Sequence, residues 1–169
     1  MLIVRAITAD DWSDYRKVRI NALKESPQAF GSTWQQEVEL PDEDWLARAT
    51  ASESGQFGRG FFAVHSNKIC GLAWCLLSDT DPRIAHVYSM WTSPAVRGQG
   101  AGRALLQQCM AWAREKGACS LVLSVAKVQA PAIQLYRSHG FYTAGESGFL
   151  RPDSDIETQK MRLDINAGA

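Results

Sequence analysis

The chain has 169 residues, of which 46% are hydrophobic, and a chain of this length can bury the core of one globular domain. Its 18 basic and 18 acidic side chains cancel. This balance gives no sign of a nucleic acid or an anionic membrane as a partner, because both attract an excess of Lys and Arg. We expect a single domain over residues 1–165 and a short tail over residues 166–169.

Strand-like and helix-like patterns alternate along the chain, without a linker rich in Pro, Gly or Ser. Their order, completed by one more strand near the C-terminus, is β-α-α-β-β-β-α-β-α-β-β, which predicts an α+β domain with a mixed sheet. The predicted ranges are, in chain order, a strand over 2–7, a helix over 8–26, a helix that begins near Pro41 after an irregular stretch from 29, strands over 60–66, 68–78 and 83–92, a helix over 102–118, a strand over 120–125, a helix over 130–140 and a strand over 155–165.

Local signals support several of these boundaries. Thr8 is a typical N-cap for the first helix, and Asn67 tolerates the positive φ of a tight turn between two strands. The helix over 102–118 has the clearest apolar stripe, and Gly117 is placed to close it. The stripe consists of Leu105, Leu106, Cys109, Met110, Trp112 and Ala113.

Apolar runs and cysteines limit the class of protein further. The apolar start of the chain ends at Arg5, and residues 71–77 are far shorter than the roughly 20 residues of a membrane span. The four cysteines show no C-x-x-C spacing and only three histidines are present, which argues against a disulfide framework and a metal site. We expect a reduced, cytoplasmic protein without a metal, and we leave open whether it forms a homodimer.

Three glycines at alternate positions, Gly98, Gly100 and Gly102, lead directly into the helix over 102–118. A helix N-terminus carries unpaired N–H groups and a partial positive charge, and glycines let an anion approach them. Arg97 and Arg103 flank the loop and can add hydrogen bonds to phosphate oxygens. The spacing fits neither a P-loop, which needs Lys followed by Ser or Thr, nor a dinucleotide fingerprint, which needs glycine at Arg103. The loop therefore predicts a phosphate site of another kind.

The stretch "RGQGAG", from Arg97 to Gly102, fits the pattern R/Q-x-x-G-x-G/A, and here the chain resembles the GNAT superfamily of acetyl-CoA-dependent N-acetyltransferases. A second block, "APAIQLYRSHGF", resembles the A-x-x-L-Y-x-x-x-G-F segment of that family. The resemblance implies a mixed, mostly antiparallel central sheet flanked by helices, with acetyl-CoA as the acetyl donor. Gln129 departs from the pattern, because the family commonly has Asn there.

The resemblance also implies which residues bind the cofactor. The strand that ends at Thr92 is expected to diverge from the next strand and to offer backbone groups to the pantetheine arm. The expected cofactor-binding residues are Met90, Trp91, Thr92, Arg97, Gly98, Gln99, Gly100, Ala101, Gly102, Arg103, Gln129, Ala132 and Tyr136.

Direct attack of an amine on a thioester requires an oxyanion donor, an acid and a base. By resemblance, the backbone N–H of Met90 is the expected oxyanion donor and Tyr136 the expected acid. Some relatives carry a catalytic glutamate four residues before the oxyanion donor, and His86 stands there. Because alternate residues of a strand share a face, His86, Tyr88 and Met90 are expected to point the same way. Glu37 and ordered water are alternative bases, and both His86 and Tyr136 can also be read as packing residues.

The acceptor site is expected in the irregular N-terminal stretch, because the two motif blocks are used by the cofactor. Phe30 and Trp34 are candidates for an apolar wall, and Glu37 is a candidate to anchor a cationic amine. The acceptor is expected to be a primary amine of a small molecule or a protein. Two other functions stay open, a non-catalytic module that senses acetyl-CoA and a nucleotide-binding module, and Tyr136 and His86 argue against the first.

Overall fold

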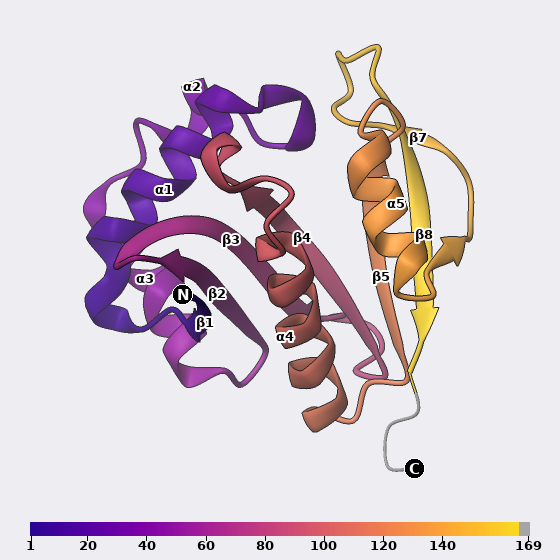
Figure 1. The fold of residues 1–169 in the computed structure, drawn as a ribbon, viewed down its shortest axis with the longest axis horizontal. Coiled ribbons are helices and arrows are strands. Elements are labelled where there is room, and N and C mark those ends of the chain that lie inside the picture. The colour runs from indigo at the N-terminus through magenta and orange to yellow at the C-terminus, as the bar shows by residue number, and fades with distance from the viewer. Residues whose placement is uncertain (166–169) are drawn as a thin grey trace.

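The computed structural model describes residues 1–165 and shows one twisted sheet with helices on both faces (Figure 1). The strand order is β1-β2-β3-β4-β5-β8-β6, and β7 also pairs with β8. Among the strands of residues 1–165, only β4 and β5 run parallel, and the other pairs are antiparallel. The strands are β1 (Leu2–Ala6), β2 (Gly58–His65), β3 (Lys68–Leu77), β4 (Ile84–Thr92), β5 (Ser120–Ala126), β6 (Tyr142–Thr143), β7 (Gly148–Phe149) and β8 (Glu157–Asp164).

Helices of very different length connect these strands. The helices are α1 (Trp12–Glu25), α2 (Trp34–Glu37), α3 (Asp42–Ser54), α4 (Ala101–Glu115) and α5 (Ala130–Ser138), with short 3₁₀ helices over Ala9–Asp11, Pro27–Ala29 and Pro94–Val96. This arrangement confirms the predicted α+β fold with its mixed, mostly antiparallel sheet. The predicted tail, residues 166–169, lies outside the described residues.

Apolar cores lie on both faces of the sheet, and the two largest are on opposite faces. On one face, the apolar stripe of α4 packs against β2, β3 and β4. The same core continues to residues of α5, β5 and β8, and it includes Leu105, Trp112 and Tyr136. On the other face, α1 and α3 pack against β2 and β3 around Tyr15 and Trp45. The predicted stripe of α4 is thereby confirmed as its buried side, and Gly117 ends this segment with φ +81°.

The irregular stretch before Pro41 contains a short helix that the sequence reading missed. The Thr33 hydroxyl accepts a hydrogen bond from the Gln36 N–H at 3.2 Å, and the Gln36 side chain accepts one from the Thr33 N–H at 3.2 Å. This reciprocal pair is a capping box, and its Thr-x-x-Gln spacing was the available signal for α2. By contrast, the turn at Asn67 is confirmed, since Asn67 has φ +66° and Ser66 before it has φ +51°.

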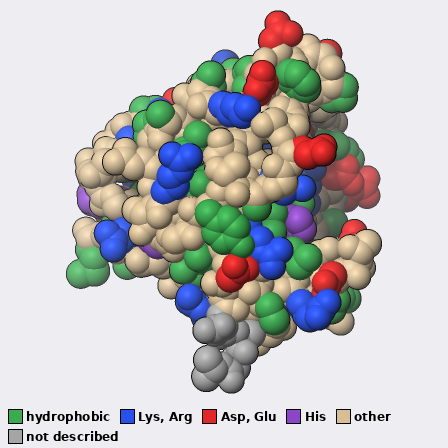
Figure 2. All heavy atoms as spheres, turned by 90° about the vertical axis from the view of Figure 1, so that its right-hand side faces the viewer, with side chains coloured by type: hydrophobic (Ala, Val, Ile, Leu, Met, Phe, Trp, Pro, Cys, Tyr) green, Lys and Arg blue, Asp and Glu red, His purple; other side chains and the backbone are tan. Residues whose placement is uncertain are grey.

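The outer surface carries both signs of charge. On the face that Figure 2 shows, Lys and Arg side chains are interspersed with Asp and Glu side chains, as expected from their equal numbers. None of the described helices combines the length and the apolar composition that crossing a membrane requires.

Candidate active site

A cleft of about 1170 Å³ opens where β4 and β5 diverge. The two strands pair only from Ile84 to His86 with Ser120 to Val122, and they separate beyond that point (Figure 1). The rest of both strands, the loop before α4, α5, residues 28–32 and parts of β7 and β8 line the cleft. The cleft therefore reaches both faces of the sheet, and the predicted divergence of the strand ending at Thr92 is confirmed.

A β-bulge interrupts β4 in the middle of the cleft. Tyr88 pairs with Trp74 and Trp91 pairs with Leu72, so that Ser89 and Met90 together stand opposite one residue of β3. Ser89 takes φ +60°, which is unusual for a residue with a side chain. The extra residue of a bulge has no ladder partner, and both Ser89 and Met90 line the cleft.

The bulge also corrects one expectation about side-chain direction. Because one extra residue shifts the alternation by one position, Ser89 and Trp91 lie on the α1 face together with His86 and Tyr88. Met90 instead packs with the core on the α4 face. The prediction that Met90 shares a face with His86 is therefore wrong. The base candidate and the Met90 side chain lie on opposite faces of the sheet.

The glycine loop has the backbone that its sequence predicts. Gly98 and Gly100 have φ +82° and φ +91°, and a Cβ on either would meet no atom within 4 Å. Within the described residues, no backbone acceptor is recorded for the N–H groups from Gly100 to Arg103. Glycine is thus required at 98 and 100 for conformation, and the open space above them suits a phosphate. Gly102 is constrained differently, because a Cβ there would lie 3.2 Å from Leu135.

The two arginines that flank the loop differ in freedom. The Arg97 guanidinium donates to the Glu25 carboxylate at 2.9 Å and to the Thr92 carbonyl at 3.1 Å, which ties it to the end of α1. Arg103 lines the cleft, and no ion pair with another described residue is recorded for it. Arg103 is therefore the arginine whose charge is available to a ligand.

Tyr136 lies on α5 beneath the cleft and is 5% exposed. Its ring packs against Phe141, with 5.7 Å between the ring centroids. Burial raises the pKa of Tyr136, and the nearby Cys109 adds to the rise. The phenol therefore keeps its proton at neutral pH and can donate it into the cleft.

His86 lines the cleft from the face of the sheet that carries α1. Its ring stacks on Tyr88 at 5.8 Å between centroids and an interplanar angle of 20°. Burial lowers the pKa of His86, and the positive charge of Lys160 lowers it further. The imidazole is therefore neutral at neutral pH and can accept a proton.

Most of the expected cofactor residues meet at this one cleft. Its walls include Met90, Trp91, Thr92, Arg97, Gly98, Gly100, Ala101, Gly102, Arg103, Gln129, Ala132 and Tyr136. Gln99 is the exception, because its side chain turns back and donates to the Ala95 carbonyl at 3.4 Å.

The expected acceptor residues divide in the same way. Phe30 is buried and lines the cleft, whereas Trp34 packs behind it and does not. Glu37 accepts hydrogen bonds from Arg19 at 2.9 and 3.1 Å and from Arg48 at 2.9 Å. Although burial opposes it, these guanidinium groups lower the pKa of Glu37 to about 2. Glu37 is thus neither a free anchor for an amine nor a base, which corrects both expectations.

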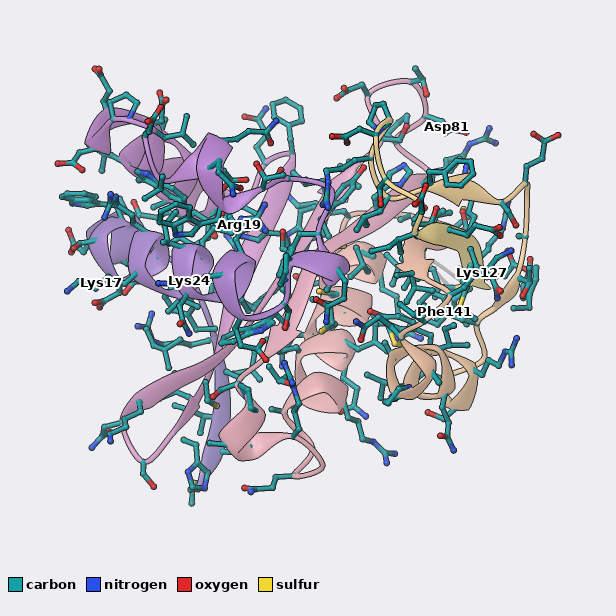
Figure 3. The ribbon with its side chains drawn as sticks, turned by 90° about the horizontal axis from the view of Figure 1, so that it is seen from above. Lys17, Arg19, Lys24, Asp81, Lys127 and Phe141 are labelled. Carbon is teal, nitrogen blue, oxygen red and sulfur yellow. The ribbon has the colours of Figure 1, made fainter. Side chains whose placement is uncertain are left out.

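Several residues at the cleft are not among the site residues predicted from the sequence. Arg19 reaches from α1 toward the sheet, whereas Lys17 and Lys24 lie on the outer side of that helix (Figure 3). The Arg19 guanidinium donates to the Ser89 hydroxyl at 2.8 Å and so supports the β4 bulge. Lys160 and Phe149 enter from the C-terminal strands. Lys160 falls within the strand predicted over 155–165, whereas no strand was predicted at Phe149, and the position of β8 beside β5 could not be read from the sequence.

Comparison with known proteins identifies the family. A family model described as the acetyltransferase (GNAT) family matches residues 15–141. The chain belongs to the GNAT acetyltransferase family. It is 38% identical over 88 residues to a streptothricin acetyltransferase from Streptomyces lavendulae, covering 52% of this chain and 46% of that protein. It is 28% identical over 121 residues to N-acetyltransferase 8B of Homo sapiens, covering 69% and 53%. The chain spans about half the length of these curated relatives.

Solved structures of GNAT acetyltransferases share the fold over nearly the whole chain. A GNAT acetyltransferase from Streptococcus pneumoniae superimposes with a TM-score of 0.85 at 19% identity, covering 98% of this chain and 100% of that one. A putative acetyltransferase from Salmonella typhimurium, solved with its cofactor acetyl-CoA, gives 0.80 at 19% identity and covers 100% and 96%. The resemblance inferred from the two motif blocks is confirmed, and acetyl-CoA is the donor that this GNAT family uses. The positive-φ glycines and free N–H groups before α4 fit such a ligand.

Proposed function

We propose that this GNAT protein transfers the acetyl group of acetyl-CoA to a primary amine of a small molecule or a protein by direct attack. The β4 bulge carries the proposal. It interrupts the pairing with β3 at Ser89 and Met90, and both residues line the cleft. The same cleft holds the glycine loop and the side chains of Tyr136 and His86, which can exchange protons. Acetyl-CoA, when bound, supplies an activated acetyl thioester.

The residues of the chain then have separate tasks. The N–H groups from Gly100 to Arg103 and the Arg103 guanidinium hold the pyrophosphate. The Met90 N–H donates to the oxygen that gains charge. Tyr136 donates a proton to the departing sulfur, and His86 accepts one from the amine. Ordered water remains the alternative to His86, since Glu37 is held by two arginines.

The test measures acetyl transfer from acetyl-CoA to a panel of amines, and the free thiol of CoA that each transfer releases is the readout. Thermal unfolding with acetyl-CoA, ATP or NAD provides a separate binding test, because a ligand of the native state raises the melting temperature. Stabilisation by acetyl-CoA alone, together with thiol release, is the expected result. Stabilisation without transfer to any amine would favour a non-catalytic sensor, and stabilisation by ATP or NAD would favour a nucleotide-binding module.

Three further points belong to this proposal. Residues 1–165 act as one domain. The protein works in the cytoplasm, which is supported by the free state of Cys70, Cys75, Cys109 and Cys119, since thiols stay reduced in that compartment. Whether it works as a monomer or a homodimer is decided by light scattering across protein concentrations.

A further inference from the structure

The walls of the cleft carry charge of one sign. The Arg and Lys side chains that line the cleft are Arg19, Arg97, Arg103 and Lys160. No Asp or Glu of residues 1–165 lines it. This differs from the mixed charges of the outer surface in Figure 2. A cleft with cations and without carboxylates favours a ligand that carries negative charge.

Two of the four cations already have carboxylate partners that do not line the cleft. Arg97 pairs with Glu25 at 2.9 Å, and Arg19 pairs with Glu37 at 2.9 Å. For Arg103 and Lys160, no ion pair with another described residue is recorded. The phosphates of acetyl-CoA account for Arg103, which follows the glycine loop. Lys160 has no corresponding task in the proposed reaction.

Lys160 lies at the acceptor end of the cleft. It pairs with Ser124 across β5 and β8, and Val122, two residues earlier in β5, pairs with His86. Because paired residues share a face and alternate residues of one strand do also, Lys160 projects on the same face as His86. The effect of its charge on the His86 imidazole agrees with this placement. An anion bound by Lys160 would thus lie beside the proposed base, away from the glycine loop.

Two loops limit the size of an acceptor at this end. The Arg151 guanidinium donates to the Phe30 carbonyl at 2.7 Å and to the Pro27 carbonyl at 3.4 Å, which joins the loop after β7 to the loop after α1. Residues of both loops line the cleft. Tyr88 and Phe149 add aromatic surface, with 50% and 63% of their area exposed. A bridged cleft with aromatic walls suits a small molecule better than an extended peptide chain.

We propose that the acceptor is a small amino acid-like molecule whose carboxylate is bound by Lys160, with its amine beside His86. This inference rests on the proposed acetyl transfer and names its substrate class. An ammonium-recognising carboxylate would be needed for a polycationic acceptor, and the described walls of the cleft do not supply one. Lys160 is thus a specificity-determining residue and not a catalytic one.

The test compares acceptors that differ only in the anion. Apolar α-amino acids, 4-aminobutyrate and 6-aminohexanoate are assayed beside their amides with wild type and Lys160→Ala. The ratio of kcat/KM for each acid to kcat/KM for its amide is compared between the two proteins, because amine basicity then cancels. We expect at least one acid to be preferred by wild type, and its ratio to fall roughly five- to tenfold in Lys160→Ala, as for a partly solvated ion pair. Activity toward the amide should change little.

The control is Lys127→Ala, because Lys127 is also an exposed lysine but pairs with Glu157 at 2.9 Å and is not among the residues that line the cleft. Its ratio should equal that of wild type. Equal use of acids and amides by wild type, or an unchanged ratio in Lys160→Ala, would overturn the proposal while leaving acetyl transfer intact.

A second measurement separates this inference from the proposed function. The melting temperature of the protein with saturating CoA is recorded with each acid and each amide, so that no acetyl transfer is needed. Stabilisation by an acid beyond its amide, lost in Lys160→Ala but kept in Lys127→Ala, supports the carboxylate site even if no amine is acetylated. Equal effects of acids and amides would overturn it.

Discussion

Replacement of Glu37 by Gln tests the ion-pair network that supports the β4 bulge. Glu37 lies between α1 and α3, and its carboxylate is shared by Arg19 and Arg48. Arg19 in turn holds the Ser89 hydroxyl at 2.8 Å. Glutamine keeps the size of the side chain but removes the charge, which leaves the buried Arg19 guanidinium without its counter-ion.

The size of the effect follows from the pKa. A decrease in the pKa of Glu37 from 4.5 to about 2 corresponds to about 3 kcal/mol of stability at neutral pH. Because the folded-state pKa is the lower one, this stability is present above about pH 4.5 and is lost as the pH falls toward 2. By about pH 3, less than half of it remains. A loss of about 3 kcal/mol lowers the melting temperature of a domain of this size by roughly 6–12 °C.

The assay is urea unfolding of wild type, Glu37→Gln and Glu39→Gln at neutral pH and at about pH 3. Glu39 is exposed and close in the chain, and no ion pair with another described residue is recorded for it, so Glu39→Gln is the matched control. The difference between wild type and Glu37→Gln should be large at neutral pH and shrink at the lower pH. A variant as stable as wild type at neutral pH, or a difference independent of pH, would refute the reasoning. If Arg19 does support the bulge, Glu37→Gln should also lower kcat in folded protein.

Three further predictions concern the cleft itself. Gly100→Val should raise the KM for acetyl-CoA by about tenfold or more, because a β-branched residue is strained at φ +91° and covers the phosphate site; unchanged affinity in folded protein would remove the phosphate role of the loop. Tyr136→Phe should lower kcat by about 10- to 10⁴-fold with little change in acetyl-CoA binding, and normal turnover would leave Tyr136 a packing residue. His86→Gln should depress kcat/KM most near neutral pH and progressively less as the pH rises, since more of the amine then arrives deprotonated. The acidic limb that His86 gives the wild-type pH profile should have its midpoint below the ordinary histidine pKa, because the pKa of His86 is lowered. A pH profile of unchanged shape in His86→Gln would favour ordered water as the base.

Local features of the sequence determined the family, the fold class and the cofactor end of the cleft. The conformation of Gly98 and Gly100, the first turn of α4 and the stripe along that helix depend on residues within one or two turns. Such short-range patterns are readable without the fold. For the same reason the Thr33 capping box is readable from its Thr-x-x-Gln spacing alone.

The acceptor end depended on the tertiary structure, because its parts are distant in the chain. The bulge at Ser89 results from the register of β3 on β4, and it reversed the expected direction of Met90. The sequence alone favoured Glu37 as an anchor for the acceptor amine, but in the fold Arg19 of α1 and Arg48 of α3 both pair with its carboxylate. Lys160 belongs to the last long strand, yet β8 inserts beside β5 in the sheet. Ion pairs and strand order are set by packing between distant segments, so the charge that faces an acceptor could be assigned only in the folded protein.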